Sequence, residues 1–151
     1  MPRLSRTEWR KTPYAKSEAS NPEGAIQQLL ARYRVKNIQM TQCAGPNRRP
    51  AFMLRFVLRD KTYRIGLETL DVADVKEHEL LLQIKRAVYY FVKSQLEIAT
   101  VFWTPEEALF AFLELPQGGT LYEIAKPQME RLTSGADFAA VLLPKPAEDP
   151  E

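Results

Sequence analysis

The chain has 151 residues, of which 45% are apolar and 26% charged, values typical of a globular protein that folds as one domain. Its single cysteine, Cys43, excludes an internal disulfide, a two-cysteine redox motif and a cysteine-rich zinc site. No apolar run approaches the roughly 18–20 residues that span a bilayer, and the basic N-terminus lacks the apolar stretch of a secretory signal. We therefore expect a cytoplasmic protein.

The formal net charge of +2 is unevenly distributed along the chain. Residues 1–66 contain 14 Lys/Arg and 4 Asp/Glu, a net charge of +10, whereas residues 67–151 contain 7 Lys/Arg and 15 Asp/Glu, a net charge of −8. This asymmetry predicts either a surface that binds a polyanion or a charged partner, or two halves that neutralise each other when they fold together.

The first 20 residues are polar and basic and predict a flexible arm, which the rings of Trp9 and Tyr14 could dock. A helix begins at Asn21-Pro22-Glu23, because asparagine caps, proline suits the first helical position and glutamate favours the positive end of the helix dipole. Its buried stripe follows with helical spacing, and a strand runs through residues 35–41. The stripe consists of Ile26, Leu29, Leu30 and Tyr33.

A β-hairpin is predicted over residues 51–67, after a loop that contains Gly45-Pro46. Apolar residues at every second position from Phe52 to Leu58 indicate its first strand, and a tight turn at Asp60-Lys61 leads into the second. The apolar face of the hairpin comprises Phe52, Leu54, Phe56, Leu58, Tyr63, Ile65 and Leu67.

Helices follow the hairpin. A long one covers residues 74–99, and a capping box at Thr104 begins another, which should bury Leu109, Phe112 and Leu113 and end at Pro116. A second capping box at Thr120 begins a helix that Pro127 interrupts and that continues to about residue 132. Residues 136–143 are apolar enough to pack back onto the body.

These elements predict an α+β fold: an α-β-β-β-α core with a three-stranded antiparallel sheet, followed by C-terminal helices. We expect a flexible basic arm (1–20), a single α+β domain (21–143) and a disordered acidic tail (144–151).

Residues suited to catalysis are sparse. His78, the only histidine, lies between two glutamates at a helix start, and Cys43 has no histidine near it in sequence. The acidic cluster of Asp71, Asp74, Glu77 and Glu79 could bind a metal ion, but such charges also favour a helix N-terminus. We predict no catalytic residue, no metal site and no cofactor, and therefore a non-enzymatic protein.

The basic residues of the hairpin are the strongest candidates for a binding site. Alternation places Arg55, Arg59 and Arg64 on the sheet face opposite the core, facing water, and the neighbouring loop adds further arginines. Such clusters bind phosphate backbones, although a polar outer face is also what an antiparallel sheet presents to water. The predicted nucleic-acid-binding residues are Arg48, Arg49, Arg55, Arg59, Lys61 and Arg64, with Arg10 and Lys11 from the arm.

Two resemblances accompany this pattern. The α-β-β-β-α order, with Gly45-Pro46 before a strand that holds Phe52, is similar in topology to a double-stranded-RNA-binding domain. However, the second helix begins with acidic residues 71–77, where that family needs lysines, so its RNA-binding residues are not carried over.

Residues 80–128 contain four structural motifs: a Leu-Leu-x-x-Ile-Lys helix core, a threonine-capped acidic helix, a Leu-Pro-x-Gly-x-Thr turn (Leu115-Pro116-Gln117-Gly118-Gly119-Thr120) and a Pro-Gln pair at Pro127. In these motifs the chain resembles a family of small uncharacterised proteins encoded by bacteriophages and prophages. The resemblance implies an origin and no particular activity.

The sequence thus predicts a phage-type accessory protein that binds DNA or RNA through the basic hairpin face and the arm. The alternative is a protein–protein interaction module, an oligomer subunit or an inhibitor of a host protein. That reading rests on the charge asymmetry and on the aromatic runs at residues 89–91 and 102–103.

Overall fold

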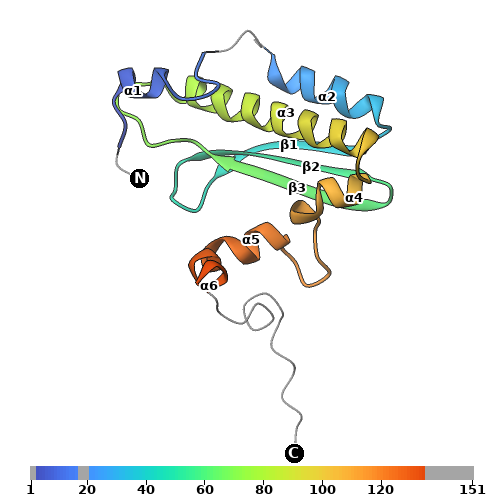
Figure 1. The fold of residues 1–151 in the computed structure, drawn as a ribbon. Helices are drawn as coiled ribbons and strands as arrows, with labels where there is room; N and C mark the ends of the chain where they lie inside the picture. The colour runs from blue at the N-terminus through green and yellow to red at the C-terminus, as the bar shows by residue number, and fades with distance from the viewer. Residues whose placement is uncertain (1–2, 17–20, 135–151) are drawn as a thin grey trace, which may run out of the picture.

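One antiparallel sheet with two helices across one of its faces forms the body of the protein (Figure 1). The computed structural model describes residues 3–16 and 21–134. The strands β1 (Lys36–Ala44), β2 (Pro50–Leu58) and β3 (Lys61–Glu68) lie in the order β1-β2-β3, and α2 (Pro22–Arg32) and α3 (Glu77–Val101) cover the sheet. The predicted α+β class with a three-stranded antiparallel sheet is confirmed.

The hairpin of β2 and β3 matches the predicted one, but its turn comes one residue earlier than expected. Leu58 pairs with Lys61, so the two turn residues are Arg59 and Asp60, with φ angles of 53° and 64°. Two successive positive φ angles define a type I′ turn, whose twist fits a two-residue hairpin. Leu58 is buried in the core, and the β2–β3 ladder therefore continues through it up to this turn.

The core lies between the inner face of the sheet and the two helices. Apolar side chains alternate along β2 and β3, and those on the inner face are almost completely buried, except Leu67, which is 37% exposed. From the helices, the predicted stripe of α2 and the apolar side of α3 pack against them. The innermost residues, at about 1% exposure or less, are Ile26, Leu30, Phe52, Leu54, Phe56, Tyr63, Val88, Val92, Leu96 and Leu109.

The N-terminal segment packs against α3. Its short helix α1 (Arg6–Arg10) begins with a capping box between Ser5 and Glu8. The Trp9 ring is buried, and its Nε1 donates a hydrogen bond to Gln83 Oε1 at 2.7 Å. Tyr14 stacks on Tyr90 at 5.3 Å between ring centroids. Trp9 and Tyr14, the two aromatic residues of the predicted arm, thus hold residues 3–16 against α3. Residues 1–2 and 17–20 of the predicted arm lie outside the described part.

The helix predicted from Thr104 begins there, with Thr104 as its N-cap, but it ends at Ala108, so the predicted extension to Pro116 is wrong. Instead α4 (Pro105–Ala108) is followed by a 3₁₀ turn, η1 (Phe110–Phe112), and Leu113 is then extended and bridges to Tyr63. The Glu114 amide donates to the Thr62 carbonyl at 2.9 Å. The edge of β3 therefore satisfies backbone groups of this segment that a longer helix would have satisfied within itself.

Three short elements complete the described chain: α5 (Leu121–Ala125), η2 (Lys126–Gln128) and α6 (Met129–Thr133). The capping box between Thr120 and Glu123 begins α5 as predicted, and Pro127 lies in the interruption η2. Figure 1 shows α5 and α6 on the side of the sheet opposite α2 and α3. The predictions for residues 136–143 and 144–151 fall outside the described residues. None of the described helices is long and apolar enough to cross a membrane.

Candidate nucleic-acid interface

The arginines of the outer sheet face are paired with carboxylates from the C-terminal part of the chain. Arg55 and Arg64 stand opposite each other on β2 and β3, where like charges repel. Glu114 lies between them: Arg55 Nε donates to its Oε1 at 2.6 Å, and Arg64 Nη1 is 3.8 Å from the same oxygen. Arg64 also forms an ion pair of 2.7 Å with Glu123 in the first turn of α5.

These ion pairs remove most of the net charge from the outer face. The hydrogen bond from Arg55 is the main reason that the pKa of Glu114 is lowered, and the charges of Arg55 and Arg64 add to it. The carboxylate therefore stays ionised to lower pH than an ordinary glutamate. Two carboxylates thus face two arginines. Here the acidic half of the chain neutralises the basic half, which was one of the two alternatives that the sequence left open.

Arg49 is also engaged within the chain. It forms an ion pair of 3.1 Å with Glu68, and its Nε donates to the Thr69 carbonyl at 2.8 Å. Burial alone would raise the pKa of Glu68, but hydrogen bonds from Asn47 and the Arg49 amide, together with the Arg49 charge, lower it. Arg49 therefore stabilises the β1–β2 loop.

The remaining predicted residues are exposed but do not form one surface. Arg48 lies in the β1–β2 loop and Arg59 in the β2–β3 turn, at opposite ends of the nine-residue strand β2. At about 3.4 Å per residue these ends are roughly 27 Å apart. Arg10 and Lys11 lie at the end of α1, next to the N-terminal half of α3. Only Arg59 and Lys61 of the eight lie at the turn end of the sheet.

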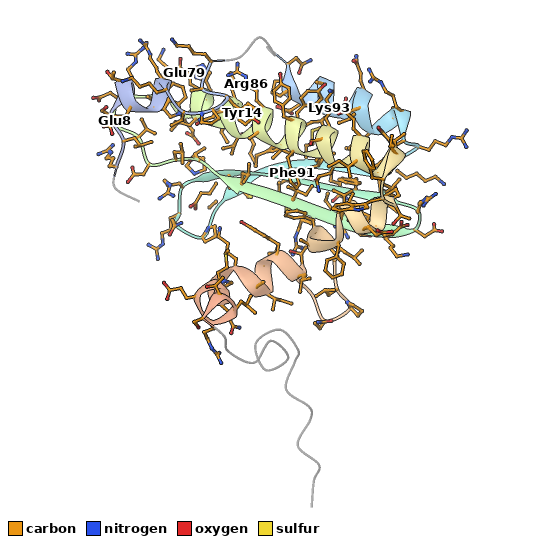
Figure 2. All side chains as sticks on the ribbon, in the orientation of Figure 1. Glu8, Tyr14, Glu79, Arg86, Phe91 and Lys93 are labelled. Carbon is orange, nitrogen blue, oxygen red and sulfur yellow. The ribbon has the colours of Figure 1, made fainter. Side chains whose placement is uncertain are left out.

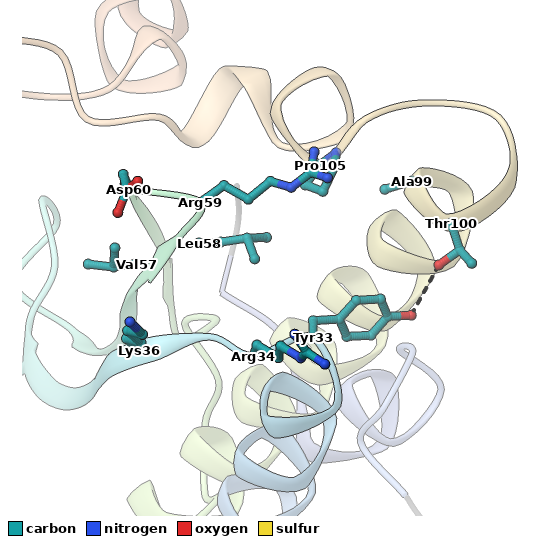
Figure 3. Close-up of a pocket in the computed structure, with 10 residues that line it drawn as sticks. All are labelled: Tyr33, Arg34, Lys36, Val57, Leu58, Arg59, Asp60, Ala99, Thr100 and Pro105. Carbon is teal, nitrogen blue, oxygen red and sulfur yellow. Dashed lines mark hydrogen bonds between the residues drawn. The ribbon is translucent and has the colours of Figure 1, made fainter.

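That end of the sheet carries a pocket of about 600 Å³, hereafter the basic pocket (Figure 3). Its apolar lining comes from strand and helix ends, and its cations are Arg34, Lys36 and Arg59. Figure 3 shows Arg59 extending across the pocket toward Pro105. The lining residues are Tyr33, Arg34, Lys36, Val57, Leu58, Arg59, Asp60, Ala99, Thr100 and Pro105.

Local backbone geometry explains the position of Arg34. The helix α2 ends in a Schellman motif, in which the Arg34 amide donates to the Ala31 carbonyl and the Val35 amide to the Leu30 carbonyl. Arg34 occupies the left-handed position of this motif, with φ of 58°, where glycine is usual. The C-termini of both α2 and α3 point to this end, and their negative dipole ends favour nearby cations.

Few carboxylates offset these cations. Within residues 3–16 and 21–134, Arg34, Lys36 and Lys61 have no ion pair, and Arg59 is 3.6 Å from Glu106 with its side chain 62% exposed. The described residues contain 20 Lys/Arg and 14 Asp/Glu, a net charge of +6. The basic pocket therefore presents positive charge that the outer sheet face does not.

Four exposed apolar side chains, hereafter called the α3–α4 corner, lie at the end of α3 and just beyond α4: Val101, Phe102, Trp103 and Phe110. The exposed fractions are 74%, 77%, 50% and 60% in that order. Ala99 and Thr100 line the pocket just before this run and Pro105 lines it just after, so residues 101–103 stand at its rim. The sequence marked Phe102 and Trp103 as surface candidates, but their position next to the cations required the fold.

Other reactive residues lie apart from this end. Cys43 is exposed on β1, and His78 is exposed in the first turn of α3. No group of three or more His, Cys, Asp or Glu side chains in the described residues could hold a metal ion. Comparisons with protein-family models, with curated proteins and with solved structures give no match for this chain.

Proposed function

We propose that this protein binds single-stranded nucleic acid, without catalysis, at the end of the sheet formed by the basic pocket, Lys61 and the α3–α4 corner. Proteins of this kind combine cations that follow the phosphate backbone with aromatic side chains on which bases stack. The observation that carries the proposal is the position of Arg34 and Lys36, which have no ion pair within the described residues, in a pocket that Thr100 and Pro105 also line, on either side of the exposed Phe102 and Trp103 in the chain.

The proposal differs from the sequence-based prediction in its location. Arg59 and Lys61 are retained from the predicted set, while Arg49, Arg55 and Arg64 serve as internal ion-pair partners. Charge reversal of one of these arginines would also leave its glutamate partner without an ion pair and next to a like charge. Such a variant would therefore test stability together with binding.

Binding is measured by the anisotropy of labelled single- and double-stranded DNA and RNA at two salt concentrations. Trp103 gives a second signal, because Trp9 is buried and a base that stacks on Trp103 quenches its fluorescence. We expect Trp103→Ala to weaken binding by about 5- to 150-fold, since one stacked base contributes about 1–3 kcal/mol. Arg34→Glu/Lys36→Glu should weaken it and lower the salt dependence.

The matched control is Arg6→Glu/Arg10→Glu, which makes the same charge change on exposed α1 residues at the other end of the molecule. Equal weakening by both pairs, or no binding at low salt, would refute the proposed surface.

A protein partner is the second candidate, because Val101 and Phe110 offer exposed apolar surface that phosphates do not need. Light scattering separates the two readings. Association of protein through the α3–α4 corner persists or increases at high salt and is lost in Phe110→Ser, whereas nucleic-acid binding falls steeply with salt.

A further inference from the structure

A second concave surface lies along β3, away from the basic pocket. It is an apolar groove of about 460 Å³ between α3 and the β3 edge, hereafter the β3 groove. Its walls include Phe91 from α3 and Leu67 from β3, both more than a third exposed, and Tyr122 from α5 stands beside them. Tyr14 and Phe91 mark its course along α3 in Figure 2.

The strand beside this groove has an open edge. The Glu114 amide donates to the Thr62 carbonyl, so the backbone groups of Thr62 point away from β2. Because hydrogen-bonding direction alternates along an antiparallel strand, the backbone N–H and C=O groups of Arg64, Gly66 and Glu68 also point away from β2. Within the described residues, the groups of Gly66 have no backbone hydrogen bond outside the β2–β3 ladder. An apolar groove next to such an edge is the geometry that accepts an added strand.

The chain itself contains a segment suited to this place. Residues 138–143, Phe-Ala-Ala-Val-Leu-Leu, carry no charge, and Pro144 follows them. In an extended strand Phe138, Ala140 and Leu142 share one face, which gives an aromatic and a large aliphatic side chain for the groove. Uncharged apolar side chains match a groove whose walls are aromatic and aliphatic.

The length of the connection matches the distance to the groove. Tyr122 lines the groove, and the path from Tyr122 to Ser134 would span at most about 20 Å if its short helical elements were collinear. Residues 135–137 allow up to about 14 Å between Ser134 and Phe138 when extended, and the side chains of Phe138 and Tyr122 can bridge the remaining distance. A segment tethered in this way has an effective concentration near the millimolar range, which favours it over a free partner.

We propose that residues 138–143 add to the open edge of β3 as a further strand, with Phe138 and Leu142 in the β3 groove and backbone hydrogen bonds to Gly66. This strand would continue the edge that the Leu113–Tyr63 bridge begins. It would cover the aromatic side chains that line the groove.

Hydrogen exchange at the Gly66 amide tests the proposal in the full chain. We expect Leu142→Asp, and truncation after Ser134, to speed exchange at Gly66 by at least about tenfold, because its hydrogen-bond partner is removed. The matched control Ala147→Asp adds the same charge outside the segment and should leave exchange unchanged. A synthetic peptide of residues 135–151 should slow exchange again in the truncated chain.

The amide of Leu54, inside the β2–β3 ladder, reports whether each variant remains folded. Equal exchange at Gly66 in the full chain and in Leu142→Asp, with Leu54 still protected, would overturn the proposal. Protection of Gly66 that rises with protein concentration would overturn it as well, because the strand would then come from a second copy.

Discussion

Replacing Gln83 by leucine should release residues 3–16 from α3 while the sheet and its two helices stay folded. The buried Gln83 amide makes three contacts with this segment: it accepts from Trp9 Nε1 at 2.7 Å and donates to Thr12 Oγ1 and the Pro13 carbonyl at 2.8 Å each. Leucine has a similar size and can make none of them.

The magnitude follows from these contacts. A hydrogen bond contributes about 1 kcal/mol net, and a buried donor left without an acceptor costs about 1–3 kcal/mol. Trp9 Nε1 would be such a donor, so docking of the segment should weaken by about 3 kcal/mol. At about 1.4 kcal/mol per factor of ten, the open population should rise roughly 100-fold.

Two assays report this opening. Trypsin cleaves after Arg10 and Lys11 only when α1 opens, so the cleavage rate should rise with the open population. In a Trp103→Phe background the remaining Trp9 emission should shift to the red as its ring becomes hydrated. The exposed Gln28 on α2 provides the control, Gln28→Leu, which should change neither signal. A less than threefold change in cleavage for Gln83→Leu would refute the reasoning.

Two further predictions concern stability. The Tyr63 hydroxyl is buried without a hydrogen-bond partner in the described residues, and burial raises its pKa to about 12, so Tyr63→Phe should raise the free energy of unfolding by up to about 1 kcal/mol, measured by urea titration. A loss of more than 1 kcal/mol would contradict this. The folded-state pKa values of Glu68 and Glu114 lie below the ordinary 4.5, so their contribution is complete above that pH and is lost as pH falls through the folded values. Urea midpoints should therefore decline below about pH 4.5, and less steeply in Glu114→Gln; equal slopes would contradict the assignment.

Local sequence patterns were sufficient to predict the elements whose hydrogen-bonding partners are close in sequence. The hairpin followed from alternation, and the helix starts at Asn21 and Thr120 followed from capping residues. The helix predicted from Thr104 starts as expected but ends early, because Leu113 pairs with Tyr63, which is 50 residues earlier in the chain. No local signal in the sequence encodes that pairing.

The candidate site was less predictable than the fold for the same reason. Alternation correctly placed Arg55 and Arg64 on the outer face, but their partner Glu114 lies 59 and 50 residues further along the chain. Charge counting indicated that the two halves could neutralise each other, without showing where. The position of Phe102 and Trp103 beside Arg34 depends on two helices ending at the same end of the sheet.

The shortness of the C-terminal elements has a consequence for the order of folding. The helices α4, α5 and α6 have four or five residues each, far below the roughly 12–15 that an isolated helix needs in water. The Glu123 carboxylate both completes the cap of α5 and pairs with Arg64, so this helix gains its start and its anchor from one side chain. We therefore expect the hairpin to form first and to serve as the template on which α4, α5 and α6 become helical.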